Sequence, residues 1–212
     1  MSTNPRGERM VAEQLRTHGI IDGRVLEVMA ALPREAFVPA GHRRLAYADH
    51  PLAIGGGQTI SQPLVVAAMT QAAAPRPDDK ALEVGAGSGY QMAVLARLCR
   101  WVVGIERDRE LATRCTATLV RLGITNVEVH HADGNLGRPA GAPYDVIVVS
   151  AAAASIPQPL LDQLADGGRL VIPVVTGTNE PQDLLLVRKR GAKLETRSLF
   201  RVLFVPLVEG TA

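Results

Sequence analysis

Three glycines near the middle of the chain have the spacing of a ligand-binding turn. Residues 83–90 read EVGAGSGY, so Gly85, Gly87 and Gly89 follow a short apolar run and precede a run with helical spacing. Glycine permits tight turns and lets a ligand touch the main chain. A dinucleotide-binding turn would place its third glycine at Tyr90, one residue later. The spacing therefore favours S-adenosylmethionine (AdoMet), which has no pyrophosphate, over NAD.

Acidic residues stand where such a ligand would need them. Glu106 directly follows the apolar run 101–105, about twenty residues past the glycines, where a carboxylate can accept hydrogen bonds from both ribose hydroxyls. Glu83 could face an ammonium group or bond loop amides, although a solvated strand-end glutamate fits its position equally well. Asp133, followed by Gly134, could meet the adenine amino group; the alternative is an ordinary Asp-Gly turn.

A second glycine-rich segment, residues 55–63 with the sequence GGGQTISQP, precedes an apolar run with helical spacing. In the simplest interpretation Ser61 caps that helix and Pro63 occupies its first turn. Capping does not account for the three glycines or for residues 58–60. We therefore also predict a flexible loop that closes over a bound cofactor.

The elements that would position these residues alternate along the chain. From residue 80 onwards short apolar strands alternate with helical patterns, which predicts an α/β fold with a mostly parallel twisted sheet and helices on both faces. Residues 183–187 and 199–207 are expected to add an antiparallel C-terminal strand pair. The strands are predicted at 81–84, 101–105, 127–130, 144–149 and 169–173, and the helices at 64–73, 91–98, 109–122 and 159–164.

The chain of 212 residues has the length and composition of a single globular domain. We expect residues 1–79 to form a helical extension with the loop 55–63, and residues 80–212 to form the cofactor-binding core. Within the extension, helices are predicted at 6–16 and 24–32, the second capped by Asp22.

Several classes of partner and site are disfavoured. The net charge of +2 and the aromatic content of 3% argue against nucleic acid binding. The polar start and the lack of a long apolar run predict a cytoplasmic protein without a membrane segment. Cys99 and Cys115 are expected to be reduced packing residues. His130 and His131 would point to opposite faces of a strand, so no metal site is predicted.

Taken together, these segments closely resemble the protein-L-isoaspartate O-methyltransferases, and the resemblance spans nearly the whole chain. Within the matching segment QTISQP at 58–63, Thr59-Ile60-Ser61 is specific to that family, whereas the glycine turn is common to methyltransferases. The other matching segments are PREAFVP at 33–39, Asp133-Gly134, APYD at 142–145, Ile156-Pro157 and GGRLVIP at 167–173.

The resemblance implies a Rossmann-like AdoMet-dependent methyltransferase that methylates the free α-carboxylate of isoaspartyl residues in damaged proteins and peptides, with S-adenosylhomocysteine as product. It places Ser61 at the active-site serine position. Val66 matches a contact position that some relatives fill with a polar residue. Segment 202–207 matches a C-terminal strand that receives an extended peptide. Cofactor contacts are implied for Gln58, Thr59, Ile60, Glu83, Glu106, Arg107, Asp133 and Gly134.

Other functions remain open at this point. The acceptor could be a normal aspartate of one dedicated peptide or protein. The chain could also be a NAD-dependent oxidoreductase, which the glycine spacing disfavours, or a non-catalytic AdoMet-binding protein. We expect a monomer.

Overall fold

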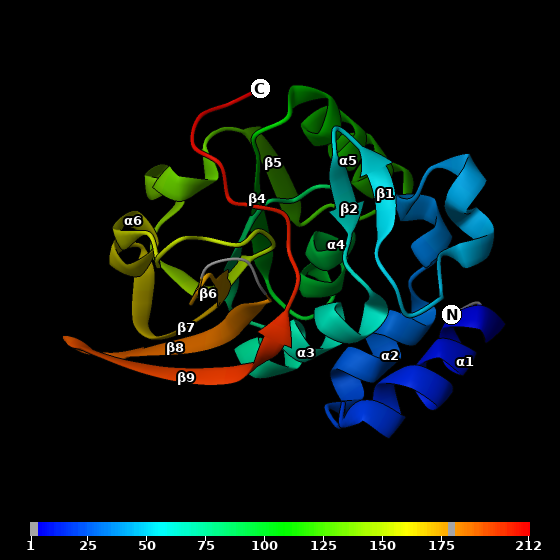
Figure 1. Ribbon diagram of the computed structural model, residues 1–212, viewed down its shortest axis with the longest axis horizontal. Helices are drawn as coiled ribbons and strands as arrows, with labels where there is room; N and C mark the ends of the chain where they lie inside the picture. Colours follow the sequence, from blue (N-terminus) through cyan, green and yellow to red (C-terminus); the bar gives the residue numbers. More distant parts are fainter. Residues whose placement is uncertain (1–3, 178–180) are drawn as a thin grey trace.

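The structure is a computed structural model that describes residues 4–177 and 181–212, and a seven-stranded sheet forms its centre (Figure 1). The strand order is β5-β4-β3-β6-β7-β8-β9. Strands β3 to β7 run parallel to their neighbours within this group, and β8 and β9 are antiparallel. The predicted fold class, including the antiparallel pair, is confirmed. The strands are β3 (Lys80–Val84), β4 (Trp101–Glu106), β5 (Val127–His131), β6 (Tyr144–Val149), β7 (Leu164–Val174), β8 (Gln182–Arg190) and β9 (Lys193–Val202).

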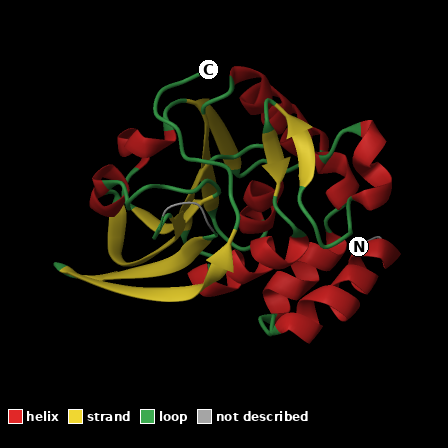
Figure 2. Cartoon of the chain, viewed as in Figure 1, coloured by secondary structure: helices red, strands yellow, loops and turns green. Residues whose placement is uncertain are grey.

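Helices pack on both faces of the sheet (Figure 2). Successive side chains of a strand point to opposite faces. In β6, accordingly, Val146 and Val148 join one apolar cluster, whereas Ile147 and Val149 join the other. The first cluster packs against α3 (Pro63–Ala73), α4 (Tyr90–Ala96) and α5 (Arg109–Arg121), and the second packs against α6 (Gln158–Asp162), near the short helices η5 (Gly134–Leu136) and η6 (Pro139–Gly141).

The order of the strands creates a crevice at one edge of the sheet. The chain passes from β3 outwards to β4 and β5, then returns to place β6 on the other side of β3. The connections that leave β3 and β6 therefore diverge beyond the carboxyl ends of these strands. In open α/β sheets, ligands bind at such a point.

The N-terminal extension packs its apolar residues into the first cluster. The predicted helix 6–16 begins as an α-helix but continues as π and 3-10 turns before it ends at Gly19, where φ is 84°. Asp22 caps the second helix as predicted, since its carboxylate accepts the N–H of Arg24 at 3.0 Å. The elements are α1 (Pro5–Met10), η1 (Val11–Leu15), η2 (Arg16–His18), α2 (Gly23–Ala31), η3 (Arg34–Phe37) and η4 (Ala40–Leu45).

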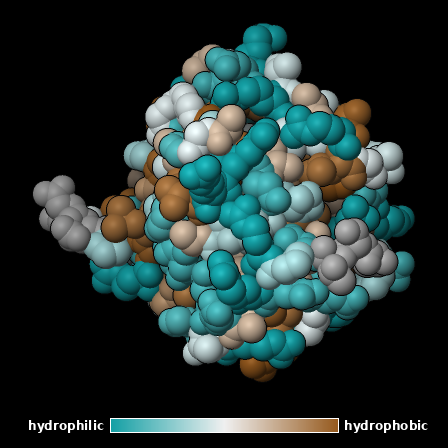
Figure 3. Space-filling view, turned by 90° about the vertical axis from the view of Figure 1, so that its right-hand side faces the viewer, coloured by the Kyte–Doolittle hydropathy of each residue, from teal (hydrophilic) through white to brown (hydrophobic). Residues whose placement is uncertain are grey.

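The outer face on the side of these helices is mostly hydrophilic, with small and separate apolar spots (Figure 3). Within residues 4–177 and 181–212, no helix combines the length and the apolar character that crossing a membrane requires.

The glycine-rich segment forms a hairpin, which the sequence analysis did not predict. β1 (Leu52–Gly55) pairs antiparallel with β2 (Gln58–Ile60), and Leu52 lies opposite Ile60. Gly56 and Gly57 make the turn with φ values of 59° and 70°. Positive φ at both central residues is what a two-residue hairpin turn of type I′ requires, and glycine adopts such values without strain. A Gly-Gly pair between short apolar runs was the available signal.

Ser61 does not cap α3, so that expectation is wrong. Gln62 occupies the N-cap position, with φ −57° and ψ 149°, and its side chain makes no capping bond. A residue that precedes proline is pushed out of the helical conformation. Because Gln62 precedes Pro63, the helix begins at Pro63, one residue too late for Ser61 to be the cap. The Ser61 hydroxyl is thereby left available for other contacts.

The last strand also differs from the expectation of a strand at 199–207. β9 ends at Val202, and beyond it only Pro206 forms an isolated bridge, with Ala152. The polar residues at the start of β9 belong to the strand because it lies at the sheet edge, where much of its surface is exposed. Residues 203–212 instead cross the carboxyl edge of the sheet. The N–H of Gly210 bonds the Asp133 carboxylate, and that of Ala212 bonds the carbonyl of Arg107.

Candidate active site

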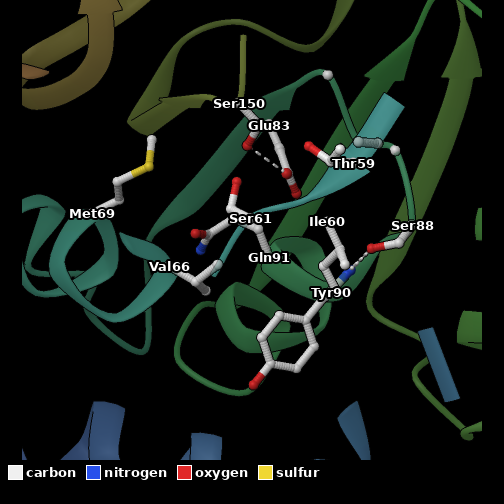
Figure 4. A pocket seen from close by; sticks show the side chains of 13 residues that line it. Thr59, Ile60, Ser61, Val66, Met69, Glu83, Ser88, Tyr90, Gln91 and Ser150 are labelled. Carbon is white, nitrogen blue, oxygen red and sulfur yellow. Dashed lines mark hydrogen bonds between the residues drawn. The ribbon is translucent and has the colours of Figure 1, made fainter. Parts of the chain in front are cut away.

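The predicted site residues gather around two adjoining cavities at the crevice beside β3. One lies towards α3 and is lined by Ser61 and Glu83 among others. The second lies towards β4 and is lined by Glu106 and Gly134 among others. The hairpin segment 58–61 covers this edge, with Thr59 in the lining of both cavities. Figure 4 shows the first cavity, into which Ser61, Glu83, Thr59 and Ser150 project their oxygen atoms.

The glycine turn after β3 depends on positive φ values, which are 81°, 52° and 86° at Gly85, Gly87 and Gly89. Gly85 and Gly87 line both cavities, so their backbone is open to a ligand. Gly89 lies behind them and serves packing. A Cβ atom there would stand 2.8 Å from the Cys115 sulfur of α5. The third glycine therefore lets α4 begin close to α5.

Glu106 is buried and ties β4 to the turn. One carboxylate oxygen accepts the N–H of Gly87 at 2.8 Å, and the other accepts the N–H of Asp108 at 2.9 Å. A carboxylate has about four lone-pair positions, so two remain for further donors such as ribose hydroxyls. Arg107, the next residue, lines the same cavity and bonds the carbonyl of Gly210 through Nε.

Glu83 is buried, so the alternative of a solvated glutamate is wrong. Its Oε1 accepts the Ser150 hydroxyl at 2.9 Å, while Oε2 has no hydrogen-bond partner among the described residues. Burial raises the pKa of Glu83 well above its usual value. The hydrogen bond from Ser150 lowers this pKa and the nearby negative charge of Glu106 raises it, but burial is the largest cause. A buried carboxyl with a free oxygen beside a cavity is suited to receive a cationic group.

Asp133 lies behind the second cavity and does not line it. Its side chain accepts the N–H of Asn135 at 2.9 Å and that of Gly210 at 2.7 Å. Partial burial alone would raise its pKa, but these bonds hold the pKa below its usual value. Asp133 thus caps η5, in agreement with the turn interpretation, and anchors segment 203–212. Its neighbour Gly134 does line the cavity.

The hairpin brings its four predicted residues to the site from one side. Ile60 is buried in the first cavity wall, and Gln58 lines the second cavity. Ser61 follows β2, and its carbonyl is held by the Arg34 guanidinium. Val66 of α3 lines the first cavity as well.

Sequence reasoning missed some lining residues. Ser150 follows β6 directly, at the carboxyl end of the strand next to β3, and this position was a usable signal. Gln91 of α4 lines the first cavity with its Oε1 unpaired among the described residues. Residues 205–208 line the second cavity. Their long separation in sequence from the turn left no local pattern to read.

A larger groove of about 750 Å³ adjoins the first cavity. Its walls come from α3, through Leu64 and Val65, and from the end of β9 with the residues that follow, such as Phe204. Thr59, Ser61 and Ser150 line both the groove and the first cavity. These three hydroxyl-bearing residues therefore mark the junction of the two spaces. Within residues 4–177 and 181–212, no group of three or more His, Cys, Asp and Glu side chains could hold a metal ion.

Comparison with known proteins identifies the family. The family model described as protein-L-isoaspartate(D-aspartate) O-methyltransferase matches residues 6–212. The chain belongs to this family. Its match to the protein-L-isoaspartate O-methyltransferase model spans the hairpin, the glycine turn and residues 203–212 alike, so every segment of the site lies inside the shared region.

Individual relatives agree with this assignment to the protein-L-isoaspartate O-methyltransferases. One from Methanoculleus marisnigri is 52% identical over 201 residues, which are 95% of this chain and 90% of the relative. A solved structure from Plasmodium falciparum, described as such an enzyme in complex with S-adenosyl-L-homocysteine, has a TM-score of 0.82, 26% identity and coverage of 98% and 99%. Another solved protein-L-isoaspartate O-methyltransferase has a TM-score of 0.85 and 27% identity over 94% of this chain and 65% of that one.

We expect Glu83→Gln to stabilise the free protein increasingly as pH rises. The unfolded carboxyl loses its proton near the usual pKa of 4.5, whereas folding raises the pKa. Between the two pKa values the folded state binds more protons, so wild-type stability falls by about 1.4 kcal/mol per pH unit. The unfolding temperature of Glu83→Gln minus that of the wild type should be nearly constant below about pH 4 and should increase above it. Each kcal/mol of stability corresponds to about 2–4 °C.

Glu27→Gln, on the exposed side of α2, controls for the loss of one negative charge. A Glu83→Gln difference that stays the same from acid to neutral pH would contradict the raised pKa.

We expect Gly89→Ala to destabilise the protein more than Gly123→Ala does. Both positions have positive φ, which costs a non-glycine residue about 1–2 kcal/mol. Only at Gly89 does the added Cβ meet a close neighbour, Cys115, whereas nothing lies within 4 Å at Gly123. Overpacking should add about 1–3 kcal/mol. Urea unfolding measures both losses.

Cys115→Ala should reduce the additional loss in a Gly89→Ala background, because it removes the sulfur that the new methyl group meets. Equal destabilisation at Gly89 and Gly123 would show that the close packing under the turn is unimportant.

Proposed function

We propose that this protein transfers the methyl group of AdoMet to the free α-carboxylate of L-isoaspartyl residues in proteins and peptides, as a repair reaction. One observation carries the proposal. Thr59, Ser61 and Ser150 line both the cavity beside the glycine turn and the larger groove. A cofactor held in the first space and a peptide held in the second would meet at these hydroxyls. Family membership and the S-adenosylhomocysteine complex of the Plasmodium relative support it.

The residues around the two cavities fit AdoMet. Glu83, with an unpaired buried oxygen, would receive the ammonium group. Glu106 would bond the ribose hydroxyls with its remaining lone pairs, and Gly85 and Gly87 would let the ligand approach the main chain. When bound, AdoMet supplies an electrophilic methyl group on a positively charged sulfur. Further walls for the cofactor would come from Gln58, Thr59, Ile60, Arg107 and Gly134, with Asp133 and Gly89 supporting from behind.

The acceptor needs little activation. An α-carboxyl group has a pKa near about 3.5, so the acceptor oxygen is already ionised at neutral pH. No general base is required. The protein must mainly hold that oxygen in line with the methyl group, and correct positioning can contribute on the order of 7–11 kcal/mol. We assign Ser61 the role of hydrogen-bonding and orienting the carboxylate. It does not become a covalent nucleophile.

Acceptor peptides would lie in the groove with limited sequence preference. β9 is the edge strand of the sheet, and an edge strand has main-chain groups free to pair with an added strand. Phe200, within β9, and residues 203–205, which follow it, line the groove. Main-chain pairing recognises the peptide backbone. A repair enzyme must act on many sequences, and this mode of recognition allows it.

We expect methylation of a synthetic isoaspartyl peptide but not of the otherwise identical aspartyl peptide. Transfer of labelled methyl groups from AdoMet measures both rates. Preference for the aspartyl peptide would instead support a dedicated normal-aspartate substrate. In calorimetry, S-adenosylhomocysteine should bind and NAD should not; binding of NAD alone would contradict the AdoMet assignment.

We expect Ser61→Ala to lower kcat by about 10- to 100-fold, because a poorly oriented acceptor reacts more slowly even when bound. S-adenosylhomocysteine should bind with nearly unchanged affinity, since the other cavity walls remain. Ser155→Ala, at an exposed position, is the matched control and should retain wild-type kcat. Unchanged turnover in Ser61→Ala would remove Ser61 from the mechanism.

A further inference from the structure

Arg34 is a buried charged residue without an obvious ionic partner. It opens η3 in the N-terminal extension, and its side chain is 0% exposed. Among the described residues no carboxylate lies within salt-bridge distance of it. Burial of a charge costs several kcal/mol unless close and well-aligned contacts offset it. Such a residue is therefore expected to hold something specific in place.

The guanidinium joins three parts of the protein. Nε donates to the carbonyl of Ala46 at 2.6 Å, and Nη2 donates to the carbonyl of Ser61 at 2.5 Å. The guanidinium also lies over the ring of Tyr90, 4.5 Å from its centre. Tyr90 is the first residue of α4, directly after the glycine turn. One planar group thus contacts the N-terminal extension, the loop that carries Ser61 (the acceptor loop, residues 58–61) and the start of α4.

The contact with the Ser61 carbonyl matters because the helix does not satisfy that group. At the start of α3, the N–H groups of Val65 and Val66 donate to the carbonyl of Gln62, the residue after Ser61. The extended conformation of Gln62 before Pro63 keeps Ser61 outside the helix. The Ser61 main chain is instead fixed by a side chain from the extension, while the Ser61 side chain projects into the cavity (Figure 4).

We propose that Arg34 is a positioning residue for methyl transfer, which orients the Ser61 hydroxyl by holding the Ser61 carbonyl while it stacks on Tyr90. The proposal rests on the function proposed above, in which that hydroxyl aligns the acceptor carboxylate. Arg34 itself would touch neither acceptor nor cofactor. It acts through Ser61, and it fixes the spacing between the acceptor loop and the helix that follows the glycine turn.

A double-mutant cycle separates this role from simple stabilisation of the fold. Arg34→Lys keeps the charge but loses the planar fork and the stacking surface. If Arg34 acts through the Ser61 hydroxyl, its replacement matters only while that hydroxyl is present. Two contributions that act through one group are not additive, whereas independent ones are.

The experiment measures kcat with an isoaspartyl peptide in the full-length chain, normalised to sites titrated with S-adenosylhomocysteine. We expect Arg34→Lys to lower kcat per site by about 10-fold or more in the wild-type background, as a misplaced reactive group does. In the Ser61→Ala background we expect the same change to lower it by less than about 2-fold.

Arg169→Lys is the matched control. Arg169 is also buried, donates to the carbonyls of Ala73 and Ala74 at the end of α3, and pairs with Asp79 at 2.5 Å. It lies away from the cavities. Its replacement should lower the unfolding temperature and leave kcat per titrated site unchanged in both backgrounds.

Equal losses of kcat from Arg34→Lys in the two backgrounds, or no loss in either, would overturn the proposal. If Arg34→Lys does not fold, Arg34→Gln, which keeps an N–H donor without the charge, replaces it in the cycle. Failure of both variants to fold, while Arg169→Lys folds, would make Arg34 a requirement of the fold and overturn the positioning role. A wild-type protein that methylates no isoaspartyl peptide would instead contradict the proposed function.

Discussion

The site is organised by the bond between the Gly87 N–H and the Glu106 carboxylate. It joins the turn after β3 to the end of β4, at the carboxyl edge of the sheet and next to the point between β3 and β6 where the strand order reverses. The N–H groups of Gly85 and Ala86 also bond the carbonyl of Ile105, so the turn is held from β4 by side chain and main chain together. A crevice in an open sheet becomes a defined binding surface only when its turns are fixed in this way. The hairpin and segment 203–212 are built around this fixed point.

Two buried ionisable groups, Glu83 in the wall of the first cavity and Arg34 behind Ser61 and Tyr90, have different roles. Glu83 keeps one oxygen unpaired beside the cavity, and its raised pKa shows how unfavourable the charge is without a cation nearby. The Arg34 guanidinium instead contacts two carbonyl groups and a tyrosine ring, although its Nη1 also has no hydrogen-bond partner among the described residues. The first arrangement costs stability and leaves a place for a ligand. The second fixes the loop that an acceptor would contact.

The sequence predicted the parts of the fold whose signals are local. Short apolar runs located β3, β4 and β6 because these central strands are buried on both faces, and Asp22 was recognisable as a cap. β9 was misplaced because its exposed edge position gives a weakly apolar pattern. Pro63 delays the start of α3, so Ser61 does not cap it. This could be seen only from the backbone angles of Gln62.

Contacts between residues far apart in the sequence were the second kind of feature that sequence patterns could not predict. Glycine spacing located the turn after β3, but it could not show that Glu83 is buried or that the N–H of Gly210 bonds Asp133, 77 residues away in sequence. Ser150 could have been found from its place at the end of β6. Arg34 could not, because nothing near it in sequence indicates that its guanidinium reaches Ser61 and Tyr90.

The path of residues 203–212 has a consequence for the order in which the protein is made. These residues reach the ends of β4, β5 and β6, and four of them, 205–208, line the second cavity. Synthesis proceeds from the N-terminus, so the glycine turn, the hairpin and most of the sheet leave the ribosome before this wall exists. Contacts across such long separations also form late in folding, since loop closure must come first. A nascent chain thus completes the wall of the second cavity only when nearly all of these 212 residues have been translated.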